Sequence, residues 1–127
     1  MIYLASPYSR SPEMYYQRVL TVTAKLIQKG YHVYSPIVHC HPLHRMEGMP
    51  KTFDFWQHHN FATLSVAGQL WVLTLPGWGE SVGVQAEIEF GKKAQKPIFL
   101  VYEATLIRDQ IFPERDSECR MKDPFFK

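Results

Sequence analysis

The chain has 127 residues, of which 46% are hydrophobic, 14% aromatic and 20% charged, and its formal net charge is +2. This length fits one compact domain that folds without disulfides or metal, and its composition excludes disorder for most of the chain. We find no membrane-spanning run and no secretion signal at the start MIYLASPYS, and two cysteines, Cys40 and Cys119, fit a reducing compartment. The small charge gives no reason to expect nucleic acid as a partner. We therefore expect a cytoplasmic domain that binds neither nucleic acid nor a membrane.

Segments with strand and helix patterns alternate along the chain. Residues 1–5 form an apolar run typical of a buried strand. Ser11, Pro12 and Glu13 then predict a helix start capped by Ser11, and Gly30 ends that helix. A second strand is predicted over 31–35. Residues 36–50, rich in proline and histidine, predict a loop. The rest predicts a helix over 52–66, a buried strand over 70–75, a helix over 81–95 and a strand over 98–102.

This order predicts an α/β fold with three layers: a flavodoxin- or Rossmann-like parallel sheet of four to five strands, with helices on both faces. We assign residues 1–102 to this domain. Residues 103–127 form a C-terminal tail with the apolar end Pro124-Phe125-Phe126, and we expect it to pack on the domain or on a partner subunit. Ligands of such sheets bind beyond the carboxyl ends of the strands, which directs attention to residues 6–10, 39–44 and 76–87.

The loop after the third predicted strand carries the densest chemical pattern. It turns through Gly77 and Trp78 and reaches Ser81 where a helix should begin, so that free backbone N–H groups and the helix dipole would favour an anion such as a phosphate. Gly83 would let a ligand approach the backbone closely. Glu87 lies within the first two turns, so its carboxylate can face the loop. A serine cap and an early glutamate are also ordinary helix stabilisers, and that interpretation stays open.

The loop after the first predicted strand offers hydroxyls and a guanidinium. Ser6, Tyr8 and Arg10 lie beside the expected crevice, where Arg10 can clamp a phosphate. Arg18, in the following helix, is a second candidate for that role. Both arginines are equally compatible with solvated positions near a helix start. Tyr3, inside the strand, belongs to the core unless its hydroxyl emerges near Glu87.

Histidines and aromatic residues gather in the middle of the chain. His39, His41 and His44 suggest a zinc-dependent hydrolase, but they form one cluster without the second ligand pair that structural zinc sites favour. We therefore predict no metal and regard His41 as a candidate site residue. The aromatic run Phe53, Phe55 and Trp56, with His58, His59 and Asn60, either walls a slot for a nucleobase or packs a helix on the sheet.

Three motifs connect the chain to a known family. They are IYLASPYS over residues 2–9, SPIVHCHP over 35–42 and LPGWGESVGVQAE over 75–87. With them the chain resembles the nucleoside 2-deoxyribosyltransferase superfamily, which includes the 2'-deoxynucleoside 5'-phosphate N-hydrolases, and within it a short uncharacterised branch. The resemblance covers about residues 1–101.

The resemblance implies a mechanism of the retaining-glycosidase type. Glu87 would attack the anomeric carbon and displace the base, Tyr3 would position that nucleophile, and Ser81 would hold a 5'-phosphate. It also implies a homo-oligomer, a dimer or tetramer, whose sites borrow residues from a neighbouring subunit. We expect no cofactor.

Three positions depart from the family pattern. Asn60 stands where an aspartate is expected, and an amide cannot act as a general acid or base. Arg10 lies one residue later than the phosphate-loop arginine, and Glu89 replaces a common glycine. Two hypotheses follow: N-glycosidic bond cleavage or deoxyribosyl transfer on a nucleoside or nucleoside 5'-monophosphate, and, as the alternative, an inactive nucleotide-binding or sensing module with the same pocket.

Overall fold

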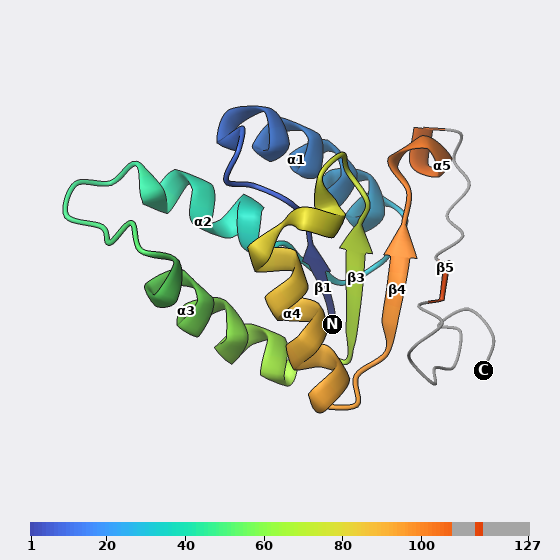
Figure 1. Ribbon diagram of the computed structural model, residues 1–127. Coiled ribbons are helices and arrows are strands. Elements are labelled where there is room, and N and C mark those ends of the chain that lie inside the picture. The colour runs from blue at the N-terminus through green and yellow to red at the C-terminus, as the bar shows by residue number, and fades with distance from the viewer. Residues whose placement is uncertain (108–113, 116–127) are drawn as a thin grey trace.

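A computed structural model describes residues 1–107 and 114–115 of the chain (Figure 1). Cys119 and the apolar end Pro124-Phe125-Phe126 lie outside the described residues. In chain order the strands are β1 (Ile2–Ala5), β2 (Val33–Tyr34), β3 (Gln69–Leu73), β4 (Ile98–Val101) and β5 (Glu114–Arg115). The helices are α1 (Pro12–Gln28), α2 (Pro36–His44), α3 (Phe53–Val66), the 3-10 turn η1 (Trp78–Glu80), α4 (Val82–Lys93) and α5 (Glu103–Ile107).

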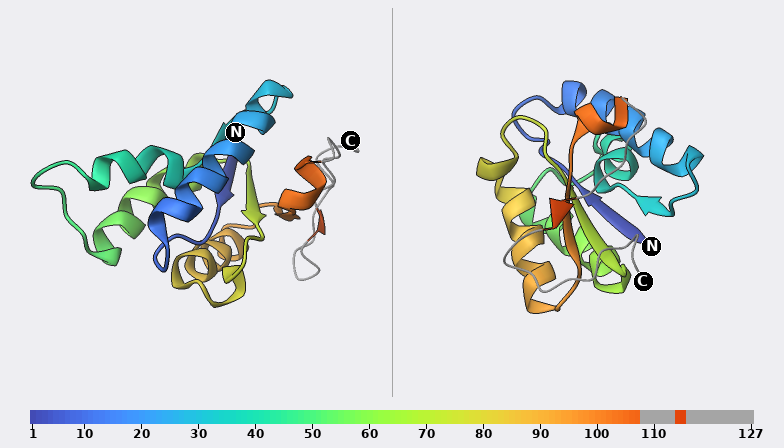
Figure 2. Two further views of the ribbon diagram at one scale, coloured as in Figure 1. Left: turned by 90° about the horizontal axis from the view of Figure 1, so that it is seen from above. Right: turned by 90° about the vertical axis from the view of Figure 1, so that its right-hand side faces the viewer.

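The five strands form one sheet in the order β2-β1-β3-β4-β5. The first four are parallel, with Tyr3 opposite Leu70 and Leu70 opposite Ile98, and β5 pairs antiparallel with β4. Helices α1 and α5 lie on one face and α3 and α4 on the other (Figures 1 and 2). The α/β fold with a parallel sheet between helical layers is thereby confirmed. Because the strand order reverses between β1 and β3, the carboxyl ends of these two strands form the switch point where such folds bind ligands.

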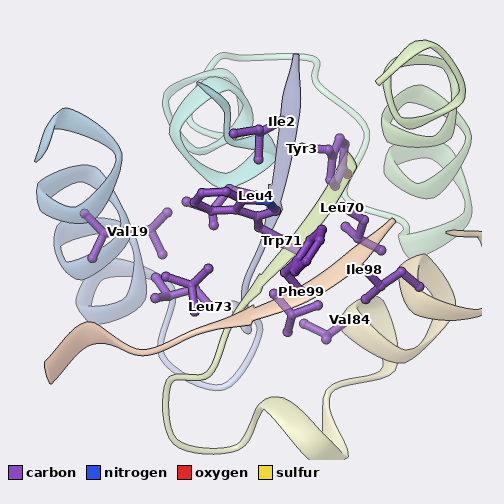
Figure 3. Close-up of a cluster of buried hydrophobic side chains, with 14 of the residues drawn as sticks. Ile2, Tyr3, Leu4, Val19, Leu70, Trp71, Leu73, Val84, Ile98 and Phe99 are labelled. Atoms are coloured by element: carbon purple, nitrogen blue, oxygen red, sulfur yellow. The ribbon is translucent and has the colours of Figure 1, made fainter. Parts of the chain in front are cut away.

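Both faces of the sheet are buried, because each is covered by helices. Leu4, Trp71 and Leu73 point toward α1, where Val19 packs against them (Figure 3). Tyr3 and Leu70 point to the opposite side, toward α3 and α4 (Figure 3). A polar side chain of α4 can therefore meet the hydroxyl of Tyr3 inside the protein. Within the described residues, no helix combines the length and apolar character needed to cross a bilayer.

The prediction of a loop over residues 36–50 was wrong for its first half, which forms α2. Ser35 caps this helix by accepting a hydrogen bond from the Val38 amide at 3.1 Å, and Pro36 occupies the first helical position. Proline is favoured there because its missing N–H would have no partner. Pro42 falls inside the helix, where it removes a backbone donor. Packing of α2 on α1 and β1 stabilises a segment whose local sequence argues against it.

Two smaller expectations also need correction. Ser11 occupies the N-cap position of α1, but its side chain makes no capping hydrogen bond. The strand predicted over 70–75 ends at Leu73, because the Leu75 amide bonds to the Leu73 carbonyl and turns the chain. The turn then carries the chain over the carboxyl edge of the sheet.

Gly91 sets the distance between α4 and the sheet. A Cβ atom there would lie 3.1 Å from Leu70 Cδ2 and 3.2 Å from Ile98 Cδ1. We expect Gly91→Val to lower the free energy of unfolding by about 1–3 kcal/mol through overpacking, measured by urea denaturation. Gly79→Val is the matched control, because nothing lies within 4 Å of a Cβ at Gly79. Equal losses in both variants would contradict the packing argument.

Candidate active site

A cavity of about 500 Å³ lies at the carboxyl ends of β1 and β3. Its walls come from the loop after β1, from α2, from the first half of α3, and from the turn that leads into α4. Most candidate residues line it: Ser6, Tyr8, Arg10, His41, Asn60, Gly77, Ser81, Gly83 and Glu87. Segments far apart in the sequence thus meet at the switch point of the sheet, as the topology requires.

Glu87 is the most perturbed acidic group at this cavity. It lies in the second turn of α4, and burial raises the pKa of its carboxyl group to about 7. The nearby Tyr3 hydroxyl acts in the opposite direction and lowers that pKa. Burial and the charge of Glu87 together raise the pKa of Tyr3 above its ordinary range, so the phenol stays protonated. The carboxyl group of Glu87, with a pKa near neutrality, therefore lies beside the Tyr3 hydroxyl, which stays protonated.

Several polar atoms at this end of the cavity lack partners. Among the described residues, four buried side-chain atoms lack a hydrogen bond of good geometry: Tyr3 Oη, Ser6 Oγ, Tyr34 Oη and Glu87 Oε2. Of these residues, Ser6 and Glu87 line the cavity. Buried polar atoms in folded proteins are nearly always paired. Ser6 Oγ and Glu87 Oε2 are therefore two unpaired atoms that a polar ligand in the cavity could reach, whereas the Tyr3 hydroxyl faces Glu87.

The start of α4 has the geometry expected of an anion site. Ser81 caps the helix by accepting a bond from the Val84 amide at 3.3 Å, which leaves its own hydroxyl proton available. A Cβ atom at Gly83 would lie 3.9 Å from Phe53 Cε2, so the helix backbone directly faces the cavity wall. Gly77 adopts a positive φ of 88°, and the Tyr15 hydroxyl holds this turn through the Pro76 carbonyl at 2.5 Å.

Three candidates are not among the cavity-lining residues: Tyr3, which is fully buried beside Glu87, Arg18 and Trp78. Arg18 instead pairs with Glu103, with Nη2 2.5 Å from Oε1 and Nε 3.1 Å from Oε2. This pair fastens α5 to α1, so the first residues of the predicted tail pack on the domain. Trp78 packs against the hydrophobic core.

The α2–α3 wall contains residues that the sequence did not single out for ligand binding. Cys40, Lys51 and Gln57 line the cavity, and so does His44, which the sequence suggested only as a zinc ligand. The expected Phe53, Trp56 and Asn60 also line it, whereas Phe55, His58 and His59 do not. The Cys40 thiol donates to Asn60 Oδ1 at 3.5 Å, and the His44 ring stacks on Trp56 at 4.3 Å. Pro36, Cys40 and His44 are spaced by four residues, as on one face of a helix. That spacing would have identified them had residues 36–44 been predicted as helical.

Among the described residues, those that could hold a metal ion are not the three histidines, His39, His41 and His44, that the sequence suggested. His39, Cys40 and His59 bring one ligand atom each within 4.8 Å of one another, whereas His41 bonds to Tyr8 and Glu13. Burial and the charge of Glu87 raise the pKa of the Cys40 thiol to about 11.

Residues 1–103 match a family described as Domain of unknown function (DUF1937). The chain belongs to the DUF1937 family. A comparison with curated proteins gives no match. The match runs from β1 to the first residue of α5, so all residues that line the cavity lie within the DUF1937 domain.

The titration of Glu87 makes the stability of the DUF1937 domain depend on pH. Its folded pKa of about 7 exceeds the ordinary 4.5, so the folded state binds this proton more tightly than the unfolded state. The resulting stabilisation is present below about pH 4.5 and is lost as the pH rises through 7, an effect on the order of 3 kcal/mol. We expect Glu87→Gln to raise the melting temperature relative to wild type at about pH 8.5, with a much smaller difference at about pH 5.

Glu89→Gln is the matched control for this measurement. Glu89 lies on the exposed side of the same helix and pairs with Lys93. Its substitution should produce no pH-dependent gain. A gain of equal size at both pH values for Glu87→Gln would contradict a raised pKa.

Proposed function

We propose that the DUF1937 domain cleaves the N-glycosidic bond of a nucleoside or nucleoside 5'-monophosphate, by hydrolysis or by transfer of the deoxyribosyl group, with Glu87 as the nucleophile. The observation that carries the proposal is the Glu87 carboxyl group itself. It is buried at the wall of a cavity of about 500 Å³, with one oxygen unpaired and with the N-terminus of its own helix beside it.

The chemistry requires an ionised carboxylate and a leaving base. One oxygen of Glu87 forms a bond to the anomeric carbon while the carbon–nitrogen bond breaks, and its electron pair leaves with the base. Water, or a second base, then attacks the same carbon and releases Glu87, so that the configuration is retained. The Tyr3 hydroxyl, which does not line the cavity, lies beside the Glu87 carboxylate and restrains it.

The cavity offers separate groups for the phosphate and the base. A 5'-phosphate fits the start of α4, where the Ser81 hydroxyl and the first backbone N–H groups are available, with Arg10 and Lys51 as the nearby cations. The exposed ring of Phe53 offers a stacking surface for a nucleobase, and Trp56, stacked on His44, lines the cavity beside it. Homo-oligomerisation and a cytoplasmic location remain predictions from the sequence.

Asn60 favours a second candidate, a nucleotide-binding or sensing module without catalysis. It lines the cavity, and its amide oxygen accepts a hydrogen bond from the Cys40 thiol. An amide at this position cannot exchange a proton with the leaving base. The two candidates share the ligand and differ only in whether the glycosidic bond breaks.

Base release decides between them. The substrates are ribo- and deoxynucleosides and their 5'-monophosphates, with free base measured by chromatography. We expect release from at least one substrate, and a loss of at least about 10³-fold in Glu87→Ala because the nucleophile is removed. Glu89→Gln, on the exposed side of α4, should retain the wild-type rate.

The same proteins distinguish the binding module. Calorimetric binding of a nucleotide, without base release over long incubation, would support the module and reject the glycosidase. Release that persists unchanged in Glu87→Ala would reject Glu87 as the nucleophile.

A further inference from the structure

Three side chains form a hydrogen-bonded line that ends at the cavity. The Tyr8 hydroxyl lies 2.6 Å from His41 Nδ1, and His41 Nε2 lies 3.0 Å from Glu13 Oε2. They come from the loop after β1, from α2 and from α1. Tyr8 and His41 line the cavity, whereas Glu13 does not. The fold thus connects a hydroxyl inside the cavity to a carboxylate outside it.

The imidazole in the middle of this line is held in a fixed orientation. His41 is buried, its ring stacks on Tyr16 at 4.1 Å, and the ring of Tyr8 meets it edge-on at 5.6 Å. Hydrogen bonds from Gln17 and His41 keep the pKa of Glu13 below its usual range, so Glu13 is an acceptor. His41 therefore carries a proton on Nε2 and presents Nδ1 to Tyr8.

A carboxylate, an imidazole and a hydroxyl in this order can move a proton to or from the hydroxyl. The other titratable and charged groups near the line are Arg45, which pairs with Glu13 at 2.5 Å, and Cys40 and His44 beside Tyr8. Burial raises the pKa of Tyr8, so its phenol keeps its proton until a strong acceptor forms. The leaving base, which gains an electron pair, is such an acceptor.

Three other groups that line the cavity already donate hydrogen bonds. The Tyr15 hydroxyl donates to the Pro76 carbonyl, the Cys40 thiol to Asn60, and Lys51 to the His44 carbonyl. Burial and the charges of Lys51 and His41 lower the pKa of His44, which disfavours its acidic form. Tyr8 is then the donor with a route for replacing its proton.

We propose that Tyr8 is the general acid that protonates the leaving base, that His41 resupplies its proton, and that Glu13 positions His41. This inference rests on the proposed function and supplies the proton that Asn60 cannot. In the doubly protonated form of His41, Nδ1–H donates to the Tyr8 oxygen and leaves the phenolic proton free to point into the cavity.

The proton transfers balance over the reaction. As the carbon–nitrogen bond breaks, the Tyr8 proton moves to the base nitrogen that received the electron pair. The Nδ1 proton of His41 moves to the Tyr8 oxygen, which leaves His41 neutral, with the proton on Nε2 still hydrogen-bonded to Glu13. When water attacks the glycosyl-enzyme, the proton it loses returns through Tyr8 to Nδ1.

A pair of substrates with different leaving groups tests the proposal. One is the nucleoside or nucleotide that releases base, and the other is the 4-nitrophenyl glycoside of the same sugar, whose nitrophenolate leaves without a proton. We expect Tyr8→Phe to slow base release by about 10²- to 10⁴-fold but nitrophenol release by less than about 10-fold. Glu13→Gln should show the same selectivity with a smaller loss.

Two controls separate this proposal from the function on which it rests. Tyr31→Phe, outside the cavity, should leave both rates unchanged, and Glu87→Ala should abolish both. Equal losses on the two substrates in Tyr8→Phe, or no loss on either, would overturn the general-acid role while the loss in Glu87→Ala still supports the glycosidase. Absence of release from both substrates by the wild-type protein would overturn the two proposals together.

Discussion

The burial of the Glu87 carboxyl group is the constraint to which the rest of the site is adjusted. A carboxylate that leaves water loses solvation, and in an unconstrained helix its side chain would turn outward. Here α4 packs closely on the sheet, because Gly91 has no Cβ atom to collide with Leu70 and Ile98. Ser81 fixes the start of the same helix. The packing of α4 thus holds Glu87 against Tyr3, and the cavity is the polar space that remains.

The charges at the cavity are arranged in two groups that do not neutralise each other. Arg10 and Lys51 are exposed, whereas Glu87 is buried. The pKa of Glu87 responds to burial and to Tyr3, and no cation contributes to its shift. A carboxylate paired with an arginine would be stabilised in its ionised form and would lose nucleophilic strength. The separation allows the cations to attract an anionic ligand while the carboxylate stays reactive.

The sequence predicted the fold better than it predicted the site. Strands buried on both faces form continuous apolar runs, so their order and the position of Ser81 and Glu87 beside the crevice followed from local patterns. The helix α2 could not be predicted from local patterns, because its proline and histidine content argues against a helix. It is stabilised by packing on α1 and β1. Pairings between distant residues were equally inaccessible: Arg18 meets Glu103 across 85 positions, and no local pattern connects them.

A buried carboxyl group is also a poor feature for a protein that only binds nucleotides. An ionised Glu87 in the same cavity would repel the phosphate of the ligand, and its burial lowers the stability of the fold at neutral and higher pH. A binding module would gain affinity and stability from a neutral side chain at this position. Asn60 carries an amide, which cannot act as a general acid, whereas the line from Glu13 through His41 ends at the Tyr8 hydroxyl. These effects support the proposal of an enzyme, with the proposed acid Tyr8 on a different wall of the cavity from Asn60.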